Sequence, residues 1–265
     1  MPPSLRNTPC FLSTRFVATD ASGRAFVSDY TTRQVWVIAA DGRSTSLLNA
    51  DSSPFASPEG VAVDGRGRVI VADRLAHCVK IFGPDLDLVH EFGKKGVSTG
   101  RFHEPAGVAA FQDLIYVADY GNHRVQVFGS DGTFRASIGD EGTGPGEFQG
   151  PTGVAVDSAG RIYVTEAMGN RLQVFDGADH TLLRTVQWLQ FPQGVAVGED
   201  GRVYVAEQRG YRVLTPEARA TLGHHVIEGR PTGIAVRGAE LFVCTGPMLR
   251  VIVQPEAVKD KSKLC

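Results

Sequence analysis

The sequence predicts an all-β fold, a six-bladed β-propeller of four-stranded antiparallel blades, from three observations. Glycine and proline are frequent, at 31 and 14 residues, as expected for many short strands joined by tight turns. A Pro-x-Gly-Val-Ala motif returns along the chain. Each copy is followed by the same succession of short apolar strands and Asp/Gly turns.

The motif sets the number and the position of the blades. Five clear copies begin at Pro58, Pro105, Pro151, Pro192 and Pro231. A degenerate sixth begins at Thr14, because Val17-Ala18-Thr19-Asp20 mirrors the pattern of the second copy. We therefore expect a single domain over residues 1–265, with blades starting near residues 14, 58, 105, 151, 192 and 231.

Within a copy, the order of strands and turns predicts a sheet. The second copy continues into Val69–Asp73, then Val79–Phe82 and then Leu88–Phe92, which gives four strands with the motif strand itself. The hairpins Asp64-Gly65, Ser130–Thr133 and Glu199–Gly201 are expected to supply the positive φ angles that such reversals need. One blade cannot bury both of its faces, so six must stack around an axis and shield one another.

Two further segments connect this pattern to a known family. Asp119-Tyr120-Gly121-Asn122-His123-Arg124-Val125 resembles the NHL repeat, and Gly100–Pro105 and Gly146–Pro151 resemble its connections between blades. The chain is similar over nearly its whole length to the NHL domains found at the C-terminus of tripartite-motif and RING–NHL proteins. The resemblance implies the fold, but the family includes protein-binding, RNA-binding and catalytic members.

Ring closure is the weak point of the prediction. Many propellers seal the circle when one terminus supplies a strand to the last blade. The candidates here are Ser4–Cys10, which is interrupted by Pro9, and Pro255–Leu264, which is rich in lysine. Neither segment is typical of a strand, so the sequence leaves open which terminus closes the ring.

Composition limits the partners and the location of the protein. With 27 Lys and Arg against 29 Asp and Glu, the net charge of −2 gives no global attraction to nucleic acid or to an anionic membrane. No apolar run approaches the roughly 20 residues of a membrane span, and the first residues lack the apolar core of a secretory signal. We expect a cytoplasmic monomer whose four scattered cysteines are free thiols.

The loops from the second to the third strand and the connections between blades are expected on one face of the propeller, here called the long-loop face. Three in-register positions on this face contain candidate ligands or structural groups. A carboxylate ends the second strand in five blades, where it could hold a cation but is more typical of a turn-forming acceptor of loop N–H groups. Four positions later, His77 and His123 are weak metal candidates without a third ligand in the ring. The next position holds arginines expected to pair with the acids. The acids are Asp29, Asp73, Asp119, Glu166 and Glu207, and the arginines are Arg124, Arg171, Arg212 and Arg250.

The long-loop face also suggests a function, since variable loops on a rigid scaffold commonly bind partners. Basic residues on one blade connection and acidic residues on the next give a two-signed surface that suits a protein or peptide better than a polyanion. Trp188 either projects outward as an aromatic anchor or fills a gap between blades, as we expect of Phe102 and Phe148. The predicted contact residues are Tyr30, Arg74, Tyr120, Trp188, Arg209, Lys94, Lys95 and Arg101.

These considerations predict a non-catalytic platform that binds a protein or peptide and has no cofactor. The resemblance implies that it could serve as the substrate-recognition module of a larger ubiquitin-ligase-type protein. An RNA-binding NHL domain is the first alternative, and it would require a positive loop face. A metal-dependent lyase of the peptide-amidating type is the second. The resemblance to the amidating lyases lacks their third in-register histidine.

Overall fold

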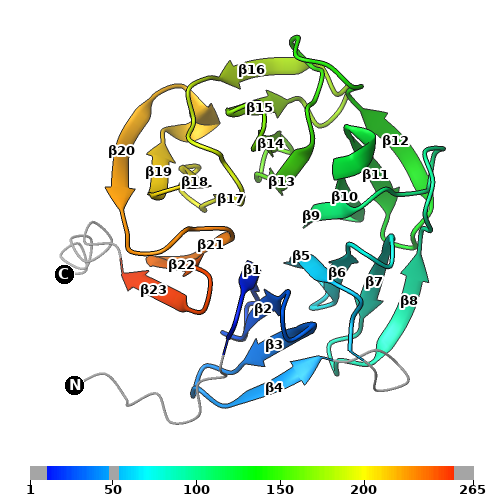
Figure 1. Ribbon diagram of the computed structural model, residues 1–265, viewed down its shortest axis with the longest axis vertical. Coiled ribbons are helices and arrows are strands. Elements are labelled where there is room, and N and C mark those ends of the chain that lie inside the picture. Colours follow the sequence, from blue (N-terminus) through cyan, green and yellow to red (C-terminus); the bar gives the residue numbers. More distant parts are fainter. Residues whose placement is uncertain (1–10, 48–53, 254–265) are drawn as a thin grey trace, which may run out of the picture.

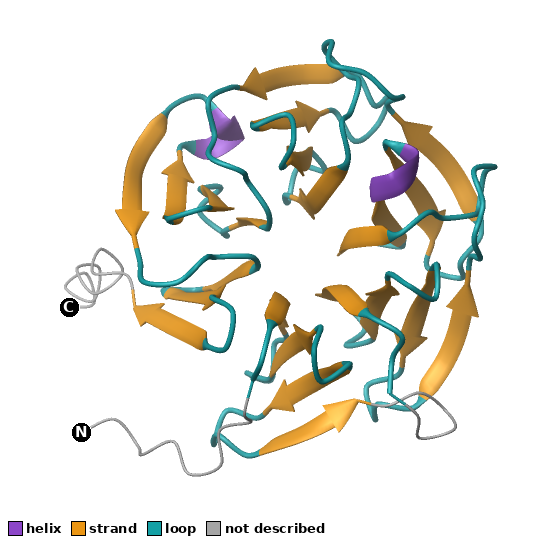
Figure 2. Ribbon diagram, in the orientation of Figure 1, coloured by secondary structure: helices purple, strands orange, loops and turns teal. Residues whose placement is uncertain are grey.

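The computed structural model describes residues 11–47 and 54–253 and shows six antiparallel sheets arranged around a central axis (Figure 1). Within each sheet the strands follow one another in chain order from the axis to the rim. Helix is limited, among the described residues, to two 3-10 turns of three residues each (Figure 2). Neither has the length to cross a membrane. The predicted all-β, six-bladed propeller is confirmed.

The two inner strands of each blade coincide with the predicted repeat. The innermost strands are β1 (Thr14–Thr19), β5 (Pro58–Val63), β9 (Pro105–Phe111), β13 (Pro151–Val156), β17 (Val195–Val197) and β21 (Ile234–Arg237). The second strands are β2 (Ala25–Asp29), β6 (Val69–Asp73), β10 (Leu114–Asp119), β14 (Ile162–Glu166), β18 (Val203–Glu207) and β22 (Glu240–Cys244). All six second strands consist almost entirely of buried residues, since both of their faces are covered by neighbouring blades.

The outer strands complete the sheets toward the rim. The third strands are β3 (Gln34–Ile38), β7 (Cys78–Phe82), β11 (Arg124–Gly129), β15 (Arg171–Phe175), β19 (Gly210–Leu214) and β23 (Leu249–Val253). The fourth strands are β4 (Ser44–Leu47), β8 (Leu88–Phe92), β12 (Phe134–Ile138), β16 (Leu182–Val186) and β20 (Thr221–Val226). The fourth strands are more exposed than the inner ones because their outward faces meet solvent.

The first hairpin of the blade is held by an aspartate and an arginine. In the second blade, Asp64 Oδ1 accepts the backbone N–H groups of Arg66 and Arg68, and its Oδ2 accepts the Arg68 guanidinium at 2.7 Å. The positive φ lies at Gly67 and not in the Asp64-Gly65 pair that we expected. In this hairpin the Asx turn places the reversal two residues later than predicted. In the other two predicted hairpins, the positive φ lies at Gly132 and Gly201, as expected.

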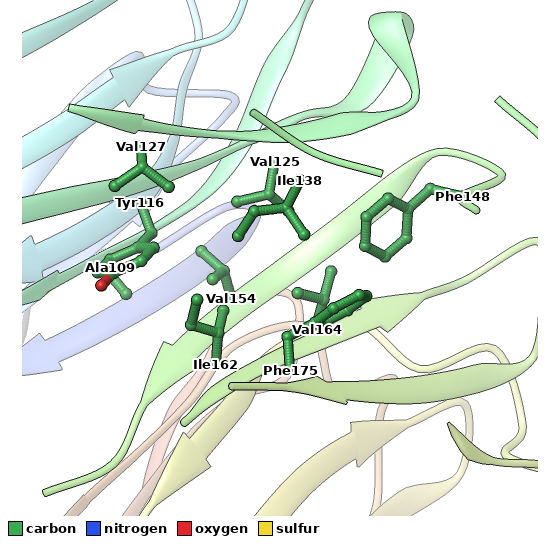
Figure 3. Packing of buried hydrophobic residues seen from close by; sticks show 10 residues of the cluster. All are labelled: Ala109, Tyr116, Val125, Val127, Ile138, Phe148, Val154, Ile162, Val164 and Phe175. Atoms are coloured by element: carbon green, nitrogen blue, oxygen red, sulfur yellow. The ribbon is translucent and has the colours of Figure 1, made fainter. Parts of the chain in front are cut away.

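Apolar clusters fill each space between adjacent blades. Figure 3 shows one of them, in which Tyr116 and Val127 of the third blade meet Val164 and Phe175 of the fourth. Phe148, from the connection between these blades, is fully buried in the same cluster. Phe102 occupies the corresponding place one blade earlier. Both residues fill gaps between blades, as predicted, and burying each contributes about 1.5–3 kcal/mol.

The glycine of the repeated motif lies where the innermost strands of adjacent blades meet. A Cβ added at any of five such glycines would come closer than 3.0 Å to the backbone of the next blade. The contacted residue is the one that precedes the glycine of that next blade, and for the sixth blade it is Arg15 of the first. The five are Gly60, Gly107, Gly153, Gly194 and Gly233. None of these glycines has a positive φ, so the backbone conformation does not require glycine. Glycine is required because a side chain would not fit between the two strands.

The ring closes between the first and the last blade through β1. The Thr14 N–H and hydroxyl both donate to the Gly246 carbonyl at 2.7 Å, and the Thr232 hydroxyl donates to the Thr14 carbonyl at 3.0 Å. Phe11, Phe242 and other buried apolar residues fill this interface. These contacts close the circle on its inner side.

The expectation of four strands per blade holds for five blades. In the sixth, the described residues provide only the three strands β21, β22 and β23. Both candidate closing segments, residues 4–10 and 255–264, lie outside the described residues. The question of which terminus completes the sixth blade therefore stays open.

Two of the four cysteines lie within the described residues. Cys78 and Cys244 are free and buried, and burial raises the pKa of each thiol to about 12. Cys10 and Cys265 fall outside the described ranges. The prediction of free thiols is confirmed for the two that can be placed.

The contact between innermost strands gives a test of the fold. We expect Gly153→Ala to lower the free energy of unfolding by about 3 kcal/mol, because the added methyl overlaps the Gln193 carbonyl of the next blade. Gly65→Ala is the matched control, since a Cβ there meets nothing within 4 Å and its φ is not positive. Urea unfolding monitored by circular dichroism measures both variants, and equal stabilities would refute the role given to the glycine.

Candidate functional site

A cavity of about 370 Å³ opens at the axis on the long-loop face. Its wall is formed where the innermost strands begin and where the second strands end (Figure 1). Because the strands are antiparallel, these two points lie at the same end of every blade. The scaffold thus brings side chains from all six blades to one opening, and this volume suits a small ligand.

The second position of each repeat lines the cavity. The glycine that follows it packs against the next blade, which leaves the preceding residue at the axis. These axial residues differ from blade to blade although the motif around them is repeated. They are Arg15, Glu59, Ala106, Thr152, Gln193 and Thr232.

Glu59 is the most unusual of the axial residues. Its side chain is 6% exposed, and Oε2 is buried with no hydrogen-bond partner among the described residues. The nearest ion pair is loose, with 3.8 Å between Oε2 and Arg15 Nε. Burial raises the pKa of the Glu59 carboxyl above its ordinary value of 4.5, although the charges of Arg15 and Arg74 oppose the shift. A buried carboxyl with a raised pKa is a better proton acceptor than an exposed one, as a general base requires.

Three arginines on the cavity wall lie over aromatic rings. Arg15 stacks over Tyr30, Arg74 over Tyr120 and Arg230 over Phe191, with the guanidinium carbons 4.6–5.2 Å from the ring centroids. Stacking fixes the plane of a guanidinium and leaves its N–H groups free to bind other groups.

Only Arg74 is firmly paired among the three. It donates to Glu104 Oε2 from both Nε and Nη2, at 3.1 and 2.5 Å. This hydrogen-bonded pair lowers the pKa of the Glu104 carboxyl, so Glu104 remains ionised beside the cavity.

The predicted contact residues occupy different parts of this face. Arg74 and Tyr120 line the cavity, and Tyr30 lies behind Arg15. Trp188 is 87% exposed and lies outside the lining, so it projects outward and does not fill a gap. The other predicted contacts are exposed and also lie away from the cavity; they are Lys94, Lys95, Arg101 and Arg209.

The carboxylates that end the second strands are structural. Asp119 accepts the His103 backbone N–H at 2.8 Å and also bonds the side chains of Asn122, Arg124 and Gln126. Asp29, Asp73 and Glu166 likewise accept backbone N–H groups of the preceding connection. The expected acceptor role and the pairing with Arg124, Arg171 and Arg212 are therefore confirmed.

The two candidate metal-binding histidines each hold the next blade connection. Nδ1 of His77 accepts the N–H of Glu104, and Nδ1 of His123 accepts the N–H of Gly150, each at 3.0 Å. Asn170 does the same for Phe191 from the same position one blade later. All three residues have positive φ, which directs the side chain toward the following blade.

This arrangement does not fit a metal ion. Nδ1 of both histidines is engaged by a backbone N–H group, which leaves only Nε2 of each ring for an ion. No group of three His, Cys, Asp or Glu side chains in the described part of the chain could hold an ion. The cavity contains Glu59 with three arginines on the same wall, a donor set that repels a cation.

Sequence reasoning missed Glu59, Arg15, Arg230 and Gln193 as site residues. A signal for three of them was present in the repeat, since the second motif position is the one that varies between otherwise similar copies. That position had no predicted role. Nothing in the local sequence singles out Arg230, which reaches the cavity from the connection before the last blade.

The architecture and its axial site define a six-bladed propeller with a small-molecule cavity. Family models refine this description, because residues 55–82 match the NHL repeat and residues 100–208 match a family described as a six-bladed β-propeller. Residues 55–82 are thus an NHL repeat within a six-bladed β-propeller. No curated protein sequence matches it.

Solved structures share the architecture over most of the chain. A gluconolactonase from Xanthomonas campestris is 20% identical to this chain and superposes with a TM-score of 0.76. The match covers 92% of this chain and 87% of that chain. A putative gluconolactonase is 16% identical, with a TM-score of 0.72 and coverages of 94% and 91%. A virginiamycin B lyase from Staphylococcus aureus is 14% identical, with a TM-score of 0.66 and coverages of 89% and 92%.

These matches overturn the expectation of a non-catalytic platform. Enzymes named as lactonases and lyases have the same fold over about nine-tenths of the chain. The inference failed because it took the missing third in-register histidine as absence of catalysis. An axial site is assembled from single residues of six blades and leaves no contiguous motif.

The structural role of the acids can be tested at the fourth blade. Arg171 is 6% exposed and bonds Glu166 from Nε at 2.6 Å. We expect Arg171→Met to lower the free energy of unfolding by about 3–5 kcal/mol, because it leaves a buried carboxylate without its cation. Arg43→Met, which breaks an exposed ion pair with Asp41, should change nothing measurable. Thermal and urea unfolding of the two variants provide the comparison, and a stable Arg171→Met protein would contradict the assignment.

The raised pKa of Glu59 predicts a pH-dependent stability. The folded state holds the Glu59 proton more tightly than the unfolded state, so binding of this proton stabilises the fold. The stabilisation is complete below the ordinary pKa of 4.5 and is lost as pH rises through the raised pKa. We expect Glu59→Gln to match the wild type near pH 4 and to be more stable at pH 7 by about 1 kcal/mol or more. Urea unfolding at both pH values measures this, with exposed Glu199→Gln as control. A less stable Glu59→Gln protein at pH 7 would disprove it.

Proposed function

We propose that this propeller is an enzyme that hydrolyses an ester bond of the lactone type in a small molecule bound in the axial cavity. The observation that carries the proposal is Glu59, a buried carboxyl with one unpartnered oxygen on the wall of that cavity. A buried polar atom without a partner costs stability and is typical of a functional site. The names of the two lactonases with the same fold suggest the type of bond.

Glu59 acts as the general base in this scheme. Its carboxylate takes a proton from a water molecule, whose oxygen then bonds to the ester carbonyl carbon. The carbonyl electron pair moves onto the carbonyl oxygen. When that intermediate collapses, the ester C–O bond breaks, and the departing alkoxide receives the proton from Glu59. Lactone and water thus give one hydroxy acid, and the carboxylate of Glu59 is regenerated.

Arg74, on the cavity wall near Glu59, stabilises the negative charge that develops on the carbonyl oxygen. It is close enough to oppose the rise in the pKa of the Glu59 carboxyl. A cation already fixed by stacking, here on Tyr120, needs little reorganisation as the charge forms.

Gln193 is the polar group on the opposite side of the axis. The second and fifth blades face each other across the ring (Figure 1), so Glu59 and Gln193 approach a ligand from two sides. The hydroxyls of Thr152 and Thr232 already donate to backbone carbonyls. The Gln193 side chain makes no hydrogen bond within the described ranges and is available to orient the substrate.

Turnover of a lactone and aryl-ester panel tests this function. We expect Glu59→Gln to lower kcat about 100-fold to 10,000-fold, the usual contribution of a general base. Glu199→Gln, at an exposed site on the hairpin face, should keep the wild-type rate. The rate should rise with pH through the raised pKa of Glu59, because only the carboxylate accepts a proton. Wild-type rates in Glu59→Gln, or no turnover of any panel member, would refute the proposal.

A further inference from the structure

The cavity wall is divided into a cationic part and an apolar part. Its three arginines come from neighbouring elements: Arg230 precedes the sixth blade, Arg15 belongs to the first and Arg74 to the second. The backbones of these blades are in contact, since Thr232 donates to the Thr14 carbonyl and Gly233 abuts Arg15. The three cations therefore occupy one continuous side of the opening.

Two of these cations have capacity to bind a ligand. Arg15 Nε is buried without a hydrogen-bond partner, and its closest carboxylate oxygen, on Glu59, is 3.8 Å away. Arg230 is exposed and stacks on Phe191 with 4.6 Å between guanidinium and ring centroid. It forms no ion pair within the part of the chain that the structure describes. Arg74, in contrast, is largely neutralised by Glu104.

The third and fourth blades contribute the apolar side. Ala106 and Ala167 are buried at the wall, and Met168 lines the cavity with 55% of its surface exposed. Small alanines leave room for a ligand, and a flexible methionine adapts to its shape. The first and fourth blades are opposite each other in the ring, so this surface faces Arg15 across the axis (Figure 1).

We propose that the substrate of this site is an organic acid, with a carboxylate bound by Arg15 and Arg230 and an apolar body against Ala106, Ala167 and Met168. This inference rests on the proposed function, because it describes the molecule that the same cavity hydrolyses. The free carboxylate is distinct from the ester carbonyl, which lies nearer Glu59 and Arg74. Guanidinium groups bind carboxylates through paired N–H donors, which suits Arg15, with only a loose ion pair at 3.8 Å, and Arg230, with none among the described residues.

Binding to the Glu59→Gln protein tests this substrate class without turnover. Isothermal titration with hexanoate, its neutral analogue hexanamide and the short acid acetate at about 0.15 M salt separates charge from apolar contact. We expect hexanoate to bind about tenfold or more tightly than either of the other two, since only hexanoate engages both sides of the cavity. Equal affinities for hexanoate and hexanamide, or no hexanoate binding, would overturn the inference.

Variants identify the residues responsible. Arg230→Met should weaken hexanoate binding about tenfold and leave hexanamide binding unchanged, as should Arg15→Met. Arg209→Met is the matched control, because Arg209 is exposed on the same face and does not line the cavity. Arg230 is exposed, so its variant is expected to fold normally even if the half-buried Arg15 proves necessary for stability. Unchanged hexanoate binding in Arg230→Met would contradict the assignment.

The two proposals fail in different ways. Ester turnover that depends on Glu59, together with equal binding of hexanoate and hexanamide, would refute the organic-acid substrate and leave the enzymatic function intact. Arginine-dependent hexanoate binding without turnover of any ester would refute the hydrolase and leave an organic-acid site.

Discussion

The close approach of backbones at five motif glycines determines the rest of this structure. Five of the six innermost strands contact the next so closely at this position that no side chain fits between them, which brings six sheets around a narrow axis. Once that distance is fixed, the second strands are enclosed on both faces and must be apolar. The loops at one end of the sheets are also brought together around a single opening.

The same constraint explains how a repeated scaffold contains an asymmetric site. The residue before each glycine faces the axis and takes no part in the blade contact, so it can change without disturbing the ring. In this chain the six positions include a carboxyl, a guanidinium, an amide and a methyl group. Chemistry is thus confined to one position per repeat and to the loops above it, while the apolar clusters between blades stay alike.

The fold could be predicted from sequence because its determinants are local and repeated. The Pro-x-Gly-Val-Ala motif marks every innermost strand, and the acid at the end of the second strand marks the loop that it supports. Even the filling of blade gaps by Phe102 and Phe148 followed from their place in the connections. These features depend on neighbours in the same or the next repeat.

The site was predicted only in part because its determinants are distant in sequence. Arg74 and Tyr120 were identified from their loops, but Glu59 becomes unusual only when Arg15, from another blade, lies beside it. A sequence pattern also does not show that His77 and His123 are occupied by backbone N–H groups of the next connection. Trp188 could have pointed either way until the left-handed backbone at that residue, with φ of 66°, directed it outward.

The histidine contacts between blades have a consequence for behaviour in acid. A neutral imidazole accepts the amide of the following connection through Nδ1, whereas an imidazolium has no lone pair with which to do so. At the next junction the acceptor is the carbonyl oxygen of Asn170, which does not titrate in this range. Burial holds the pKa of His77 below its ordinary value, so only acid strong enough to protonate this imidazole removes the acceptor between the second and third blades, whereas the junction held by Asn170 keeps its acceptor.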